Sequence, residues 1–224
     1  MLDFFYKEKG TGYPIVLLHG FCETHSIWDD FREKLSDEFR VITPDLPGFG
    51  NSPLPHKPFL LADIASGLYH FIKEELRLNN CIVIGHSLGG YITLEIERKY
   101  YEILDGFCLF NSTAFEDAPE KKSNRNKLIE FIDREGVPPF IKTFVPSLFN
   151  PNRADEFESI IHAIHNQALK TDPEAVKAYA AAMRDRPDST DLLRSSARRA
   201  FLISGELDSS VTLEASISMQ KLLP

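Results

Sequence analysis

A serine lies between glycines at the point where an apolar stretch runs directly into a helical pattern. Residues 81–90 read Cys-Ile-Val-Ile-Gly-His-Ser-Leu-Gly-Gly, and Ser87 is the centre of a Gly-x-Ser-x-Gly pattern. A serine on a sharp strand-to-helix turn has an exposed hydroxyl, and small residues two positions before and after it avoid clashes. The first amides of the helix can then stabilise an oxyanion. The pattern therefore predicts that Ser87 is a nucleophile, and an ordinary Gly-Ser turn is the simpler alternative.

A second loop suited to binding an oxyanion follows the His-Gly pair that ends the apolar run 13–20. Neighbouring parallel strands end at the same edge of a sheet, so the backbone amide of Phe21 can point to the same oxyanion as the amide of Leu88. The alternative is a plain strand end with a turn glycine. The loop 45–52 follows another strand end, and we expect its proline and glycines only to fix its shape.

Short apolar runs alternate with helical patterns along the chain. Uniformly apolar strands joined by helices indicate a parallel sheet covered on both faces. The predicted strands are 13–20, 38–45, 80–85, 106–111 and 199–205, and the predicted helices include 26–37, 60–77, 88–99 and 211–222. The expected fold class is therefore α/β, with a mostly parallel sheet.

The alternation stops between the last two predicted strands, where only helical patterns occur. A parallel crossover needs about a dozen residues, so this longer stretch carries an insertion. Asp172-Pro173 is a typical helix start within it. Helices inserted above a sheet form a cap, where pockets often lie. We expect a core domain of residues 1–113 and 191–224, and a helical cap of residues 114–190.

The composition limits the expected partners. The chain has 25 Lys and Arg against 33 Asp and Glu, a net charge of −8 with no basic stripe, which argues against nucleic acid. No apolar run has the ~18–20 residues that a membrane span needs, and the first residues lack a signal-peptide pattern. Cys22, Cys81 and Cys108 have no metal or redox spacing. We expect a cytoplasmic protein that binds a small molecule, without a membrane, a metal or a cofactor.

Four motifs, in this order, resemble the α/β-hydrolase superfamily in its small serine esterase-like branch. They are Leu-Leu-His-Gly-Phe, Pro-Asp-Leu-Pro-Gly-Phe-Gly-Asn-Ser, Gly-His-Ser-Leu-Gly-Gly and Ile-Ser-Gly-Glu-Leu-Asp-Ser-Ser-Val, which together span nearly the whole chain. The resemblance implies Ser87 as the nucleophile and the Phe21 and Leu88 amides as the oxyanion hole. It also implies a helical cap between the sixth and seventh strands of the fold.

The resemblance places the acid of a catalytic triad at Asp208, in the loop after the last predicted strand. Asp208 could instead cap the helix predicted over 211–222. Another position that the family uses for the acid, after its sixth strand, holds Asn111, which is not a carboxylate. Glu206 lies nearby, where the pattern is variable.

No histidine of the sequence fits the third member of the triad, which in this family follows the acid. His19 is expected to be structural, and His86 adjoins the nucleophile on a sharp turn and points away from it. His162 and His165 fit a solvated helix face better than a metal pair. We therefore expect a C-terminally shortened hydrolase that lacks the last strand and the catalytic histidine, with turnover reduced by ~10⁴–10⁶. The run 199–205 then becomes an exposed sheet edge through which the chain can self-associate.

The resemblance implies a serine hydrolase that acts on a small carboxylic ester or related acyl substrate through an acyl-enzyme. Lyases, C–C bond hydrolases and haloperoxidase-like members share the same residues and stay open as alternatives. Dehalogenases and epoxide hydrolases are disfavoured, because they place an aspartate where Ser87 stands. A non-catalytic ligand-binding or interaction protein on the same scaffold is the alternative from another class, although such a protein has no need of a strained serine.

Overall fold

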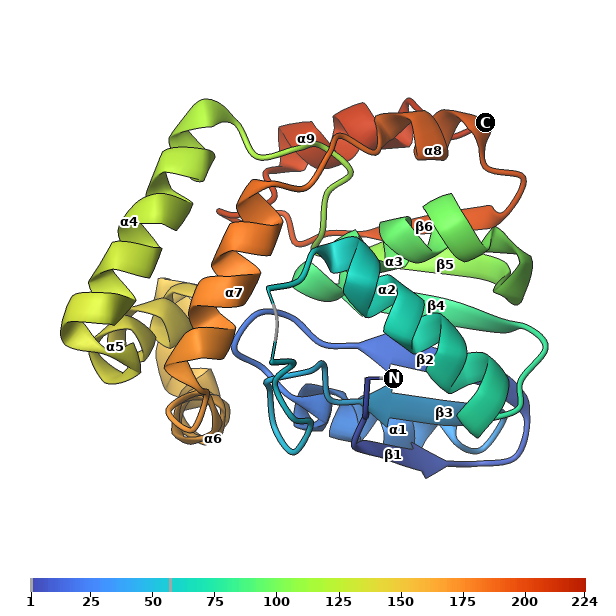
Figure 1. The fold of residues 1–224 in the computed structure, drawn as a ribbon, viewed down its shortest axis with the longest axis horizontal. Helices are drawn as coiled ribbons and strands as arrows, with labels where there is room; N and C mark the ends of the chain where they lie inside the picture. Colours follow the sequence, from blue (N-terminus) through green and yellow to red (C-terminus); the bar gives the residue numbers. More distant parts are fainter. Residues whose placement is uncertain (1, 57) are drawn as a thin grey trace.

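The computed structural model describes residues 2–56 and 58–224 and is built around one twisted sheet (Figure 1). The described residues form six strands in the order β1-β3-β2-β4-β5-β6. All neighbouring strands are parallel except β1, which pairs antiparallel with β3. The strands are β1 (Tyr6–Lys9), β2 (Tyr13–Leu18), β3 (Phe39–Pro44), β4 (Cys81–His86), β5 (Leu104–Phe110) and β6 (Arg199–Ile203). The predicted α/β class and mostly parallel sheet are confirmed.

Strand β1 has no counterpart among the predicted strands. Its sequence, Tyr-Lys-Glu-Lys, is largely exposed and carries no apolar run. It joins the sheet through its backbone, with Tyr6 opposite Pro44 and Lys9 opposite Val41 at the edge of β3. Hydropathy patterns detect strands that bury side chains, so they miss a short strand of this kind.

Helices cover both faces of the sheet (Figure 1). One face carries α2 (Leu61–His70), which continues as a wider π-type turn over Phe71–Glu75, and α3 (Leu88–Tyr100). The other carries α1 (Asp29–Leu35) after a short 3₁₀ turn, His25–Trp28. Buried apolar side chains fill the space on the α2 and α3 side, among them Val16, Ile64, Leu68, Val83, Ile92 and Phe107. The smaller cluster under α1 contains Ile15, Leu17, Trp28 and Val41.

The segment between β5 and β6 forms helices but no strand, and its four longer helices lie at one end of the sheet (Figure 1). We call its four longer helices, α4–α7, the helical insertion. They are α4 (Pro119–Glu135), α5 (Val137–Ser147), α6 (Glu158–Ala168), preceded by a 3₁₀ turn at Pro151–Phe157, and α7 (Pro173–Arg184). The Asp172 side chain accepts a hydrogen bond from the Glu174 amide at 2.8 Å, so α7 begins where the sequence predicts.

Two short helices complete the chain around β6. Helix α8 (Thr190–Ser195) leads into the strand, and α9 (Leu213–Gln220) follows it, while Tyr101–Ile103 forms a 3₁₀ turn before β5. Within the described residues β6 is an edge strand, with Phe201 62% exposed and Ile203 48% exposed. In that same part of the chain, no helix has both the length and the apolarity to span a membrane.

Candidate active site

Ser87 lies at the junction between β4 and α3, as the sequence predicts, and is partly exposed. Its φ of 50° and ψ of −112° are unfavourable for a residue with a side chain. Hydrogen bonds from β5 and the segment after it hold this turn. The Ser87 amide donates to the Phe110 carbonyl at 3.0 Å, and the Ser112 hydroxyl donates to the Ser87 carbonyl at 2.7 Å. The surrounding structure therefore enforces the strained conformation.

The glycines on either side of Ser87 are required by close packing. A Cβ on Gly85 would lie 2.3 Å from the backbone carbon of Gly89, and a Cβ on Gly89 would lie 2.6 Å from the Leu18 carbonyl oxygen. Side chains at these positions would push the start of α3 away from β4 and β2. The small residues of the motif thus bring the helix N-terminus close to Ser87.

The two predicted oxyanion donors follow neighbouring strands. Leu88 is the first residue of α3, so its amide has no acceptor within the helix. Phe21 follows β2, which pairs in parallel with β4 through Leu18 and Gly85. The Phe21 ring is buried, with its centroid 5.9 Å from that of Phe144 on α5. The structure therefore puts both residues at adjacent strand ends, and their role as an oxyanion hole stays a prediction.

Asp208 lies in the loop after β6. Its Oδ1 atom accepts hydrogen bonds from the amides of Ser210 at 2.7 Å and Val211 at 3.0 Å. Helix α9 is capped by a different residue, Thr212, whose hydroxyl accepts from the Ala215 amide. The carboxylate thus shapes the loop and does not cap the helix. Its role as the triad acid stays a prediction.

Asn111 supports the same loop from the end of β5. Its φ is 44°, a left-handed conformation that asparagine tolerates better than most residues. The Asn111 amide donates to the Ile203 carbonyl at 2.7 Å, and its Oδ1 accepts from the Gly205 amide at 3.3 Å. The residue therefore links β5 to the segment that carries Asp208.

Next to the predicted site lies a buried acid, Glu23, which the sequence did not predict. Its Oε2 accepts a hydrogen bond from the Gly20 amide at 2.6 Å and lies 2.9 Å from Nδ1 of His86. Burial opposes both charges. Nevertheless the attraction and hydrogen bond between the two groups lower the pKa of Glu23 and, with a smaller contribution from Asp208, raise the pKa of His86. The only signal in the sequence was an acid three residues after the strand-end glycine, where burial was not predicted.

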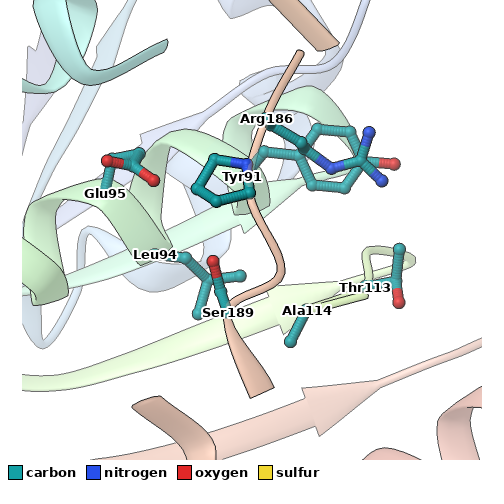
Figure 2. A pocket seen from close by; sticks show the side chains of 8 residues that line it. Tyr91, Leu94, Glu95, Thr113, Ala114, Arg186 and Ser189 are labelled. Atoms are coloured by element: carbon teal, nitrogen blue, oxygen red, sulfur yellow. The ribbon is translucent and has the colours of Figure 1, made fainter. Parts of the chain in front are cut away.

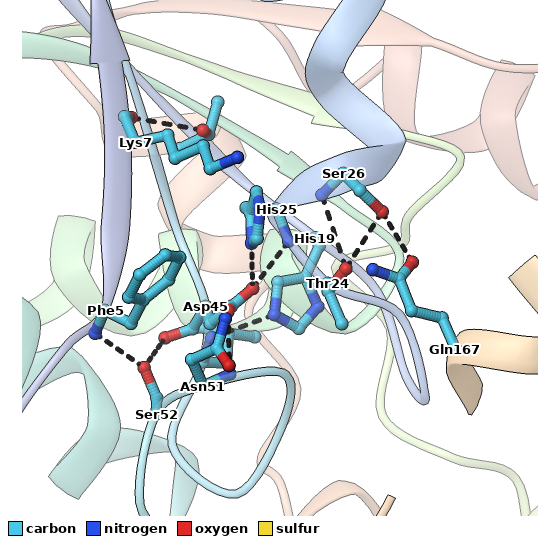
Figure 3. A network of polar contacts seen from close by, with 12 residues as sticks. Phe5, Lys7, His19, Thr24, His25, Ser26, Asp45, Asn51, Ser52 and Gln167 are labelled. Carbon is cyan, nitrogen blue, oxygen red and sulfur yellow. Dashed lines mark hydrogen bonds and ion pairs between the residues drawn. The ribbon is translucent and has the colours of Figure 1, made fainter. Parts of the chain in front are cut away.

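His19 has the structural role that the sequence predicts. Its Nε2 accepts from the Leu46 amide at 2.8 Å (Figure 3). Its Nδ1 donates to the Gly20 carbonyl at 2.8 Å. This pattern fits the neutral ring, and burial lowers the pKa of His19. The histidine thus ties the loop after β3 to the loop that carries Phe21.

A buried carboxylate organises the loop after β3. Asp45 accepts from the His25 amide at 2.7 Å and the Asn51 amide at 2.9 Å, and its Oδ1 lies 2.8 Å from Nδ1 of His25 (Figure 3). Burial alone would raise the pKa of Asp45, but these hydrogen bonds lower it. Next to this network, the Ser26 hydroxyl donates to Oε1 of Gln167 at 2.6 Å, which connects the loop after β2 to α6. The insertion and the predicted oxyanion loop are therefore in direct contact.

The two ends of the insertion meet on α3, around a small cavity of about 10 Å³ (Figure 2). Such a volume holds about one water molecule. The Arg186 guanidinium lies 3.9 Å from the centroid of the Tyr91 ring and pairs with Asp117 at 2.8 Å. The cavity is therefore too small for a substrate, and the contacts around it join the two ends of the insertion to α3.

The remaining histidines lie away from these contacts. Nδ1 of His70 is 2.8 Å from Oε1 of Glu74 on an exposed part of α2, and His162 lies 3.2 Å from the Asn166 amide nitrogen on α6. Over residues 2–56 and 58–224, no group of three or more His, Cys, Asp or Glu side chains is arranged to hold a metal ion. The contacts of His162 fit the solvated helix face that the sequence favours.

Comparison with known proteins adds three relatives. A solved thermophilic esterase from Thermogutta terrifontis is 33% identical with a TM-score of 0.93, covering 100% of this chain and 82% of that one. The 2-hydroxy-6-oxo-6-(2'-aminophenyl)hexa-2,4-dienoic acid hydrolase of Metapseudomonas resinovorans is 26% identical over 183 residues, 80% of this chain and 60% of that protein. A Mycobacterium tuberculosis protein is 29% identical over 107 residues, which is 48% of this chain.

The curated relatives are longer than this chain, which spans about a third of the mycobacterial protein (31%). The match to a family model covers more of this chain than either curated relative does. The sequence model of the alpha/beta hydrolase family matches residues 15–222, which include Ser87, Phe21, Leu88 and Asp208. The chain belongs to the alpha/beta hydrolase family.

Proposed function

We propose that this chain carries the nucleophile and oxyanion hole of a serine hydrolase that acts on a small carboxylic ester or related acyl compound. The observation that carries the proposal is the backbone of Ser87, with φ at 50° on the turn into α3. Strained conformations of this kind cost about 1–3 kcal/mol, persist only where the surrounding structure holds them, and cluster at active sites. The 33% identity to an esterase supports an ester as the substrate class.

The proposed reaction runs through an acyl-enzyme. The Ser87 hydroxyl oxygen attacks the carbonyl carbon and loses its proton to a base, and the carbonyl oxygen becomes an oxyanion held by the amides of Leu88 and Phe21. The carbonyl forms again as the alcohol leaves with a proton, and the acyl group stays on Ser87. Water then attacks this ester and releases the acid. Asp208 would orient and stabilise the histidine that serves as the base.

We expect catalysis by this chain to be limited by the lack of a general base for Ser87. His19 bonds the Leu46 amide through one ring nitrogen, His25 bonds Asp45, and His86 is paired with Glu23. None of these rings is free to accept the Ser87 proton in this arrangement. We therefore expect turnover ~10⁴–10⁶ below that of a complete triad, with the remainder supplied by the oxyanion hole and by binding.

Cleavage of a carbon–carbon bond is a second candidate. The Metapseudomonas relative, named for a 2-hydroxy-6-oxo-dienoic acid, matches 80% of this chain. The same nucleophile, acid and oxyanion donors serve several reactions on this fold. A non-catalytic binding protein on the same scaffold would also have no free base, but it would gain nothing from the strain at Ser87.

The test is hydrolysis of p-nitrophenyl acetate and p-nitrophenyl butyrate by the chain and by its Ser87→Ala variant, with a 2-hydroxy-6-oxohexa-2,4-dienoate as a third substrate. Mass spectrometry of the chain after treatment with a fluorophosphonate would show whether Ser87 is reactive. Faster ester turnover than Ser87→Ala supports the esterase proposal, and preference for the dienoate supports the second candidate. Equal rates alone agree with the missing base, whereas no labelling of Ser87 at high fluorophosphonate concentration would refute both enzymes and favour the binding protein.

A further inference from the structure

We propose that the buried Glu23 carboxylate and the partly exposed His86 ring form a pair that positions the Phe21 amide beside Ser87, so that Glu23 is a positioning residue for the oxyanion hole. This inference rests on the proposed function, because it assigns Phe21 the role of an oxyanion donor. Glu23 lies outside the four sequence motifs that predict the site.

The carboxylate stands between the two halves of the site. One oxygen, Oε2 of Glu23, accepts from the Gly20 amide at 2.6 Å and lies 2.9 Å from Nδ1 of His86. Gly20 immediately precedes Phe21, and His86 immediately precedes Ser87. A single atom therefore fixes the distance between the loop after β2 and the turn after β4.

The loop that carries Phe21 needs this support. Cys22 has a φ of 60°, a left-handed conformation that is unfavourable for a residue with a side chain. The Glu23 amide makes only a long hydrogen bond of 3.4 Å to the Gly20 carbonyl. Without the carboxylate, the Gly20 amide would lose the acceptor that the structure gives it, and the strained turn would lose one of its restraints.

The pair is tightly packed on the Gly20 side, and Glu23 is more deeply buried than His86. The Glu23 side chain is 6% exposed and the His86 side chain 23% exposed. A Cβ on Gly20 would lie 2.6 Å from Oε2 of Glu23 and 2.9 Å from Nδ1 of His86. The glycine of the His-Gly pair thus makes room for the ion pair, which is a second reason for its presence.

The charged groups around the pair act in its favour. Glu23 receives attraction from His86, and His86 receives attraction from Glu23 and, to a smaller extent, from Asp208. The Trp28 and Phe110 rings, 6.4 and 6.0 Å from the His86 ring, bring no charge. The Nδ1 atom of His86 is engaged by Glu23 at 2.9 Å, so the histidine next to the nucleophile belongs to the positioning of the site.

The test compares the wild-type chain with Glu23→Gln, which keeps the size and an acceptor oxygen but removes the charge. Glu116→Gln is the matched control, since Glu116 makes an exposed salt bridge to Lys122 at 2.5 Å. Thermal unfolding first shows that each variant is folded. NMR then follows the His86 ring titration and the chemical shift and hydrogen exchange of the Phe21 amide, and kinetics with p-nitrophenyl acetate separate kcat from KM.

We expect Glu23→Gln to lower kcat about 10–100-fold with KM nearly unchanged, since loss of one oxyanion donor costs ~10²–10³. The His86 titration should move to lower pH and Phe21 amide exchange should quicken, while Glu23→Asp recovers part of kcat. Unchanged Phe21 exchange and shift in a folded Glu23→Gln would overturn the proposal. If the fluorophosphonate does not label Ser87, the proposed function fails, and the Phe21 amide alone decides whether Glu23 positions the loop.

Discussion

The guanidinium of Arg186 lies over the ring of Tyr91, 3.9 Å from its centroid, one turn of α3 beyond Ser87. The same group pairs at 2.8 Å with Asp117, and both side chains are almost fully buried. Asp117 precedes α4 and Arg186 follows α7. The beginning and the end of the insertion are therefore joined to each other and to the helix behind the nucleophile.

Replacing Arg186 by alanine should strongly destabilise the chain, because it leaves the Asp117 carboxylate buried with only Arg125 as a partner at 3.2 Å. Removing one partner of a buried ion pair costs about 3–5 kcal/mol of unfolding free energy. Urea denaturation measures the loss. Arg134→Ala is the control, since Arg134 is 70% exposed, and it should leave the urea midpoint in place. Equal midpoints for the two variants would contradict this prediction.

Gly85→Ala should destabilise the turn that carries Ser87. The added Cβ would lie 2.3 Å from the backbone of Gly89, which cannot move without displacing α3. Overpacking of this kind costs about 1–3 kcal/mol, occasionally more. At Gly205 the nearest atom to an added Cβ is 3.7 Å away, so Gly205→Ala should be tolerated. Thermal unfolding of the two variants tests the difference, and a Gly85→Ala variant as stable as Gly205→Ala would show that the turn relaxes.

The three thiols should be unreactive in the folded chain. Cys22, Cys81 and Cys108 are all buried and make no disulfide. Burial raises the pKa of Cys81 to about 12 and that of Cys108 to about 11, so little thiolate forms at neutral pH. Ellman's reagent should therefore react slowly with the native chain. In urea, where the chain is unfolded, it should react quickly with all three thiols. In a control variant, Ser123→Cys, the new thiol is at an exposed position and should react at once. A fast reaction of the folded wild-type chain would contradict the burial of its three cysteines.

The contribution of the Glu23–His86 pair to stability should depend on pH. The lowered pKa of Glu23 gives stability that is present above about pH 4.5 and lost as pH falls through the folded value. The raised pKa of His86 gives stability that is present below about pH 6.5 and lost as pH rises through the folded value. The difference in unfolding free energy between wild type and Glu23→Gln should thus be largest between these values. Urea denaturation across pH 4–9 measures it, and a flat difference would show that the pair is not ionised.

Self-association through β6 is a proposal that a single substitution can test. Phe201 is 62% exposed on this edge strand, which presents unpaired backbone groups. Phe201→Lys should reduce association, measured by light scattering after size-exclusion chromatography over a range of concentrations. Leu60, which is 56% exposed at the start of α2, supplies the control Leu60→Lys. If both variants associate as the wild type does, the edge is not the contact surface.

The sequence predicted the features that depend on local patterns. The parallel strands, the helical insertion and the turn at Ser87 all follow from apolar periodicity and glycine spacing, which act within a few residues. Strand β1 was missed because it buries almost nothing. The alternative in which Asp208 caps α9 is wrong, because Thr212 caps the helix and Asp208 holds the turn before it.

The contacts between distant residues could not be predicted in this way. Glu23 and His86 are 63 positions apart, and Asp117 approaches Arg186 only because two ends of a long insertion converge. Nothing in either neighbourhood marks these residues as partners. Such pairs depend on the packing of strands and loops in three dimensions, which hydropathy patterns do not encode.

The chain leaves the core for the helical insertion and returns to it at the same place. The Ser189 amide donates to the Ala114 carbonyl at 2.8 Å, so the two crossing points are hydrogen-bonded neighbours. A short linker could bridge them without stretching the sheet, and lengthening such a bridge adds only about 0.6 kcal/mol of closure entropy for each doubling. Replacing the insertion by such a linker should therefore leave the strands that hold Ser87 in place.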